Sequence, residues 1–227
     1  MVAETLQDIS FARAQVKGVD LAGLVYRRDV PDWWTEHQNA VLAPEWQPMP
    51  AIIPPSNKNM PTNSLVVFRS GGTYALTISG EGSEILIGPD CVLEYAQIRC
   101  GGGKITIGRG FKCDADLQID LRNGGSLHIG ESCIAELRVE ISTLDINPIF
   151  EIESRTRITK INKEIHIGSR VWLGTESVIN GGATIGSDSV IRARSVVVDP
   201  LPSNALCEGN PAEAIQLGIV WQQENIE

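Results

Sequence analysis

The sequence predicts an all-β protein built on a parallel β-helix, a backbone that winds in coils with three short faces. Aliphatic residues recur at every sixth position near the C-terminal end, at Ile167, Leu173, Ile179, Ile185, Ile191 and Val197. Four positions after each of the first five comes a second inward residue, which is Val171, Ser177, Ala183, Ser189 or Ser195. A period of six is neither helical nor that of a simple alternating strand. A single coil cannot bury its apolar residues, so stacked coils must share one continuous core.

The coils are expected to span residues 65–207 and to be less regular at first. Ile-Gly pairs begin at residues 87, 107, 129 and 167 and mark successive returns to one face. Because three hexads make 18 residues, the separations of 20, 22 and 38 imply inserts of two, four and twenty residues. We expect glycines 101–103 and 124–125 to absorb the short inserts as turns. The long insert, at about 143–164, is expected to leave the coil as a protruding loop, and such loops are usually functional.

Residues 1–64 carry no repeat and are expected to form an irregular N-terminal extension. Apolar residues between Leu6 and Val16 favour one helix, and Pro31 favours a second, short helix that reaches His37. Six prolines between positions 44 and 61 exclude regular helix and favour an extended segment on a surface. The extension is interpreted as a cap on the open end of the β-helix, with a substrate-binding role as the alternative.

The C-terminal tail, residues 208–227, follows the point where the hexads stop. Pro200 and Pro202 end the repeat, and apolar residues between Ile215 and Trp221 predict that the tail folds back as a helix or a strand. The sequence does not decide between these two.

Composition limits the possible partners. The formal net charge of −9 argues against nucleic acid or an anionic membrane surface as the main partner. The N-terminus lacks a basic start followed by an apolar run, and no stretch approaches the ~18 apolar residues of a membrane span. We therefore expect a cytoplasmic protein without membrane insertion. The five cysteines form no CxxC pair and are predicted to be buried free thiols.

Four short stretches resemble one known family. VWLG at 171–174, INGGATIG at 179–186, IRARSVV at 191–197 and GNPA at 209–212 are similar to the hexapeptide-repeat acyltransferases, in particular to their sugar and polysaccharide O-acetyltransferase branch. The resemblance is specific over about 140–212 and weaker over 65–139. It implies a left-handed parallel β-helix, an exception to the usual right-handed crossover. It also implies a homotrimer with active sites between subunits, and acetyl-CoA as the co-substrate.

Transfer of an acyl group to a hydroxyl requires a base for the hydroxyl proton and donors for the developing oxyanion. The resemblance places the base, a histidine, in the protruding loop, where this chain reads TLDINPIFE from Thr143 to Glu151. Asn147 occupies the histidine position, and a carboxamide has no lone pair of useful basicity. Asn147 can still hold an acceptor hydroxyl or donate to an oxyanion. Four other side chains are candidate bases: Asp145, His166, His128 and His37.

The resemblance also implies a site for the carrier. Gly174, Thr175 and Ala193 match positions that bind the pantetheine arm largely through backbone groups. Trp172 matches an indole that lines the acyl site, although a tryptophan at a coil corner can equally be packing.

The phosphates of coenzyme A meet less favourable residues. Asp199, Glu213 and Gln216 stand where related enzymes place lysine or arginine, and the two carboxylates have the wrong sign for phosphate. Three outward arginines are either compensating phosphate partners or solvated surface charges: Arg170, Arg192 and Arg194.

Two functions are therefore open. The first is a coenzyme A-dependent acyltransferase whose acceptor, a sugar, polysaccharide precursor or related small molecule, binds beside the 143–164 loop. An amine acceptor would ease the problem of the missing base, since a neutral amine needs no deprotonation before attack. The second is an inactive homologue that serves as a trimeric scaffold or binding subunit. No GxSxG, P-loop or metal-ligand motif is present, and we expect no metal.

Overall fold

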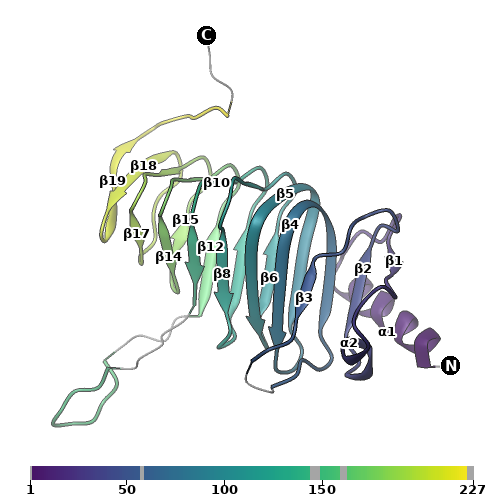
Figure 1. The fold of residues 1–227 in the computed structure, drawn as a ribbon. Helices are drawn as coiled ribbons and strands as arrows, with labels where there is room; N and C mark the ends of the chain where they lie inside the picture. The colour runs from purple at the N-terminus through teal and green to yellow at the C-terminus, as the bar shows by residue number, and fades with distance from the viewer. Residues whose placement is uncertain (1, 57–58, 144–148, 159–162, 224–227) are drawn as a thin grey trace.

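The protein is a stack of β-coils with helices at its N-terminal end (Figure 1). The computed structural model describes residues 2–56, 59–143, 149–158 and 163–223. Its elements are α1 (Val2–Val16), β1 (Val25–Tyr26), α2 (Asp32–Glu36), β2 (Ala40–Ala43), β3 (Ala51–Ile53), β4 (Leu65–Ser79), β5 (Glu84–Gly101), β6 (Lys104–Ile107), β7 (Lys112–Cys113), β8 (Gln118–Leu121), β9 (Ser126–Ile129), β10 (Ile134–Ala135), β11 (Glu140–Ser142), β12 (Glu164–Ile167), β13 (Trp172–Leu173), β14 (Val178–Asn180), β15 (Thr184–Ile185), β16 (Val190–Ile191), β17 (Val196–Val197), β18 (Ala205–Gly209) and β19 (Ala212–Leu217).

The coils stack in parallel register, as the six-residue period predicts. On the first face, the isoleucines of the Ile-Gly pairs are direct partners from one coil to the next: Ile87, Ile107, Ile129, Ile167 and Ile185. The second face aligns Leu93, Cys113, Ala135, Leu173, Ile191 and Cys207. The third aligns Ile98, Ile119, Ile141, Ile179 and Val197. The predicted parallel β-helix is confirmed.

The interior of the stack is one continuous hydrophobic core. The aligned aliphatic residues are buried, and so are the second inward residues Val171, Ser177, Ala183, Ser189 and Ser195. All five cysteines are free and buried. Burial raises the pKa of Cys91, Cys113 and Cys133 to about 11, because a low-dielectric surrounding disfavours the thiolate.

Two of the three corners are tight and recur with the coils. They place a residue in the left-handed backbone region at each turn, where a non-glycine residue is uncommon. One corner uses Asp90, Ser132, Arg170, Asp188 and Asn204; the next uses Tyr95, Asp116, Arg138, Glu176 and Arg194. These side chains therefore project into solvent in two ladders along the coil edges.

The third corner takes the inserts. Glycines 101–103 and 124–125 turn the chain between the third and first faces, as predicted, and Gly102, Gly124 and Gly125 have positive φ. A side chain at Gly125 would bring its Cβ to 2.3 Å from the carbonyl oxygen of Lys163 in the next coil. The twenty-residue insert leaves from the same corner, between β11 and β12. The described part of this insert, residues 149–158, is visible at the lower left of Figure 1.

The N-terminal extension packs on the first coil and adds strands to it. Both predicted helices form, as α1 and α2. The proline-rich region stays extended, and its strand β3 pairs in parallel with β4, as does β2. Trp34 of α2 is fully buried in the main core, at the N-terminal end of the stack. In the described part of the chain, neither helix is long and apolar enough to cross a membrane.

The C-terminal tail folds back as a strand, which settles the question that the sequence left open. β19 runs antiparallel to β18, and the turn between them contains a cis bond before Pro211. After β19, the chain returns across the corner of the coils, where the Trp221 indole donates to the carbonyl of Arg170 at 2.8 Å.

Candidate functional site

Trp172 and Thr175 lie together at one corner of the coils, held by a carboxylate from the preceding coil. The Trp172 indole Nε1 donates to Glu136 Oε1 at 3.0 Å. The backbone N and the Oγ1 of Thr175 both donate to Glu136 Oε2, each at 2.8 Å. Hydrogen bonds to an ionised acceptor are among the stronger ones in proteins. Glu136 therefore fixes the two residues that the sequence assigns to the acyl and carrier sites.

Gly174 allows this arrangement because it lies beside Glu136 in the stack. The register pairs Ala135 with Leu173, so position 136 stands next to position 174. Gly174 presents no side chain there, and the Glu136 carboxylate reaches past it to Thr175. A Cβ on Gly174 would lie 2.7 Å from both the Ala193 nitrogen and the Ile191 oxygen. Glycine is thus required by close coil contact.

A second tryptophan, Trp221, covers the preceding corner, that of Ser132 and Arg170, from which the chain enters the face that begins with Trp172. The rings of Trp172 and Trp221 are 5.9 Å apart between centroids and are inclined by 50°. Trp221, Arg170, Ser132 and two glutamines of the tail line an open hollow of about 510 Å³. Trp172 therefore contacts both the Glu136 carboxylate and the tail aromatic.

The three arginines considered for phosphate are each paired with a carboxylate. Arg170 pairs with Asp188 at 2.5 Å, Arg192 with Glu208 at 2.8 Å and Arg194 with Glu176 at 2.8 Å. Arg138 also pairs with Glu176. The bond from Arg194, followed by the charge of Arg138, lowers the pKa of Glu176.

The other residues that were considered for the coenzyme A site lie on the surface. Ala193, Asp199, Glu213 and Gln216 are exposed, and Glu213 is the strand partner of Glu208. Both backbone groups of Thr175 are engaged, the N–H by Glu136 and the carbonyl by the N–H of Arg194 at 2.9 Å. A carrier arm at this corner would therefore meet the Trp172 ring and the exposed turn at Ala193 rather than the Thr175 backbone.

His128 and His166 stack on the outside of the first face. They are register partners on β9 and β12, both are exposed, and their rings lie 4.8 Å apart at 16°. Partial burial, followed by the neighbouring His166, lowers the pKa of His128. His37 instead caps α2 at the N-terminal end, where its Nδ1 is 2.7 Å from the Trp33 carbonyl oxygen.

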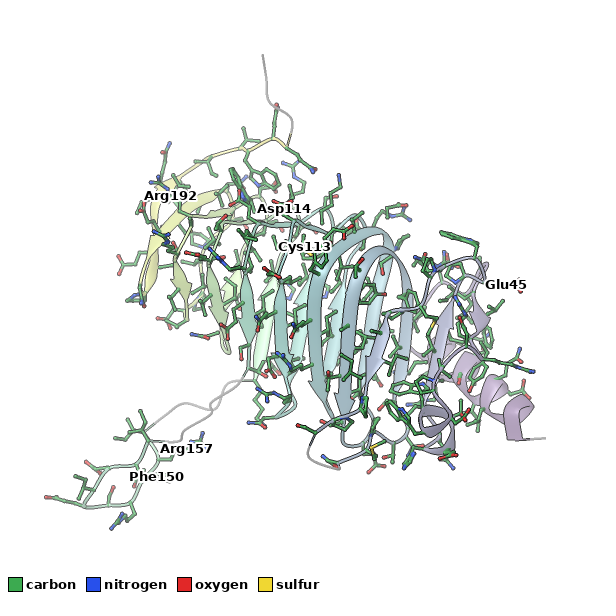
Figure 2. All side chains as sticks on the ribbon, viewed as in Figure 1. Glu45, Cys113, Asp114, Phe150, Arg157 and Arg192 are labelled. Carbon is green, nitrogen blue, oxygen red and sulfur yellow. The ribbon has the colours of Figure 1, made fainter. Side chains whose placement is uncertain are left out.

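The loop residues proposed for catalysis, Asn147 and Asp145, lie outside the described residues. The described parts of the motif differ in exposure. Thr143 is buried, and its Oγ1 donates to the Gly124 carbonyl at 2.9 Å. Phe150, in contrast, is half exposed on the part of the loop that stands away from the coils (Figure 2).

Glu136 and the contact made by Trp221 were missed by sequence reasoning. Glu136 follows an inward residue of the second face and precedes no recognisable motif, so only its register next to a glycine could have indicated it. Trp221 lies 49 positions from Trp172, in a tail without a repeat. No group of three His, Cys, Asp or Glu side chains suited to a metal ion occurs in the part of the chain that the structure describes.

Comparison with known proteins agrees with the coils. Residues 164–199 match the family model "Bacterial transferase hexapeptide (six repeats)". The chain is 33% identical to galactoside O-acetyltransferase of Escherichia coli (strain K12) over 115 residues, which is 51% of this chain and 55% of that protein. It is 31% identical to polysialic acid O-acetyltransferase of Neisseria meningitidis over 129 residues, 47% of this chain and 60% of that protein.

A solved structure shows the same fold over most of the chain. The polysialic acid O-acetyltransferase OatWY superposes with a TM-score of 0.63, covering 79% of this chain and 93% of that one at 19% identity. The predicted left-handed parallel β-helix and the resemblance to hexapeptide-repeat acyltransferases are confirmed. The matched regions span 55% and 60% of the two curated relatives named above.

Proposed function

We propose that the chain is an acetyl-CoA-dependent acyltransferase, and more narrowly an O-acetyltransferase for a sugar, a polysaccharide precursor or a related small molecule. The observation that carries this proposal is the 33% identity to galactoside O-acetyltransferase over 115 residues. The corner formed by Trp172, Gly174 and Thr175 falls within the stretch that matches the hexapeptide transferase model. A cytoplasmic location would supply acetyl-CoA and keep the buried thiols reduced.

In this proposal the acceptor hydroxyl attacks the thioester carbonyl, the C–O bond forms, and the C–S bond breaks. The hydroxyl proton passes to a base, and the carrier leaves as a thiolate that is then protonated. Trp172 lines the acyl site, and Asn147 donates to the oxyanion or holds the acceptor. Asp145 and His166 are the bases we propose, because a carboxamide at position 147 cannot accept the proton.

We further propose that the active unit is a homotrimer, in which the loop of one subunit meets the Trp172 corner of another. The described loop tip supports this, since it exposes several apolar side chains: Ile149, Phe150, Ile152 and Ile158. Exposed apolar groups gathered on one segment are typical of a surface that another chain covers.

An inactive trimeric scaffold or binding subunit is the second candidate. The ion pairs favour it, because Arg170, Arg192 and Arg194 are each already bound to a carboxylate. Asp199 and Glu213 are exposed where related enzymes need positive charge.

One experiment separates the two functions. Calorimetry with acetyl-CoA, followed by thiol release with a panel of sugars, is applied to the wild type and to Asn147→His, with Asn180→His as a control for an added imidazole on the coils. We expect the wild type to bind acetyl-CoA and to turn over. Asn147→His should be faster by about 10² or more, because a general base contributes about 10²–10⁴ in rate.

The other outcomes are equally decisive. If neither protein binds acetyl-CoA, the acyltransferase proposal is wrong. If only Asn147→His turns over, the native chain is a disarmed relative and the scaffold function is favoured.

A further inference from the structure

The Glu136 carboxylate accepts hydrogen bonds from neutral donors, whereas the neighbouring carboxylates Glu208 and Glu176 pair with arginines. It is partly buried, and its carboxylate accepts from the Trp172 indole, the Thr175 backbone and the Thr175 hydroxyl. The nearby arginines on the same edge, Arg192 and Arg194, are engaged by Glu208 and Glu176. A carboxylate bonded in this way fixes the orientation of its donors.

The three bonds link two coils at one point. Glu136 follows β10, whereas Trp172 is the first residue of β13 in the next coil and Thr175 lies just after that strand. Backbone pairing alone sets the positions of these strands, but it does not set the rotation of the Trp172 ring about its side-chain bonds. The bond to Nε1 does so, because an indole has a single donor.

We propose that Glu136 is the positioning residue of the carrier site, which fixes the Thr175 turn and holds the neighbouring Trp172 ring in the orientation that receives the pantetheine arm. This inference rests on the proposed function. In the absence of the carboxylate, the indole loses its partner and rotates, and the turn loses two bonds. The arm then has to order both elements on binding, and this cost reduces affinity.

The test uses two readouts on the full chain. The first is the hydrogen-exchange rate of the Trp172 indole N–H in protein labelled with ¹⁵N-tryptophan, assigned with Trp172→Phe. The second is the Kd for acetyl-CoA by calorimetry, with kcat and KM measured alongside. The variants are Glu136→Ala and Glu136→Gln. Glu140→Gln is the matched control, since Glu140 is exposed on the same coil.

Glu136→Ala should accelerate indole exchange and raise Kd and KM, each by about tenfold, the value of one charged hydrogen bond. It should change kcat less, because Glu136 acts on binding geometry. Glu136→Gln keeps the size but replaces one acceptor oxygen by an NH₂ donor. Its amide oxygen can serve the two Thr175 donors, so indole exchange should still accelerate while Kd takes an intermediate value. Glu140→Gln should change neither readout.

Unchanged indole exchange in both Glu136 variants would overturn the inference whatever the kinetics. Faster exchange with an unchanged Kd would also overturn it, because the ring orientation would then not matter to the carrier. A wild type that binds no acetyl-CoA would refute the proposed function and this inference together. If the wild type binds and Glu136→Ala binds equally well, the inference alone is wrong.

Discussion

The late coils, from β12 to β17, and the early coils, from β5 to β11, solve the same packing problem with different residues. In the late coils the second inward position holds Val171 and then a serine or alanine at 177, 183, 189 and 195. In the early coils the same position holds residues that range from small to large, all of them buried: Cys91, Ala96, Phe111, Leu117, Cys133 and Val139. The repeat therefore fixes where a side chain points, whereas the size of the residue at that position varies from coil to coil.

The difference between the two regions is concentrated at the third corner. Between the third and first faces, six residues separate Ile179 from Ile185 in the late coils. In the early coils the same step takes nine residues from Ile98 to Ile107 and ten from Ile119 to Ile129. The step from Ile141 to Ile167 takes 26 and carries the loop. Because the inserts are confined to the third corner, they leave the register between Glu136 and Trp172 regular. A regular register is what a candidate site with fixed geometry requires.

The largest effect that distinguishes the two regions is expected at alkaline pH. Burial raises the pKa of Cys91, Cys113 and Cys133, all in the early coils, to about 11. The folded protein thus binds more protons than the unfolded chain between about pH 9 and 11, so stability present below pH 9 is lost as pH rises. The loss is up to about 3 kcal/mol for each thiol.

This dependence can be measured by urea unfolding between pH 8 and 11, comparing wild type with Cys133→Ser. Serine fills the equivalent position at Ser189 in the late coils and does not titrate in this range. The variant should show a shallower decline with pH, whatever its stability at neutral pH. An identical slope in both proteins would show that the Cys133 thiol is not the source.

A smaller effect should follow from adding one methyl group in each region. Gly174→Ala places a Cβ 2.7 Å from backbone atoms of the next coil, and such overpacking costs about 1–3 kcal/mol. The matched change in the early part, Gly71→Ala, meets only the Cys91 oxygen at 3.9 Å and should change stability by less than about 0.5 kcal/mol. Urea unfolding midpoints would measure both changes in the free energy of unfolding, provided that the variants share the same m-value. Equal losses at the two sites would contradict the close contact of Gly174 with the next coil.

The smallest effect on stability is expected from the loop. Replacing residues 150–157 by a short glycine-serine linker removes exposed side chains such as Phe150 and Ile152. The free energy of unfolding should change by less than about 0.5 kcal/mol, while acyl transfer should be lost. A large drop in the melting temperature would instead place the loop among the elements that hold the coils together.

Much of this architecture could be predicted because the repeat is local and periodic. The Ile-Gly pairs named the first face correctly, and their spacing located the glycine turns and the loop. The candidate site was harder to predict from the sequence. Trp172 and Thr175 were predicted through a resemblance and stay a prediction as site residues. Arg192 and Arg194 looked available for phosphate until their pairing with Glu208 and Glu176 was seen. The tail also could not be assigned as helix or strand, because β19 forms only against β18.

The sequence by itself determined the winding of the chain, since side chains that return at each sixth place can be buried together only in stacked three-sided coils. Tertiary structure alone decided which outward side chains meet. Glu136 lies 36 positions from Trp172 and contacts it because a loop-bearing coil brings position 136 beside Gly174. The six-residue period tells which way each side chain points. Which residue it meets in the next coil depends on the length of every insert between the two positions.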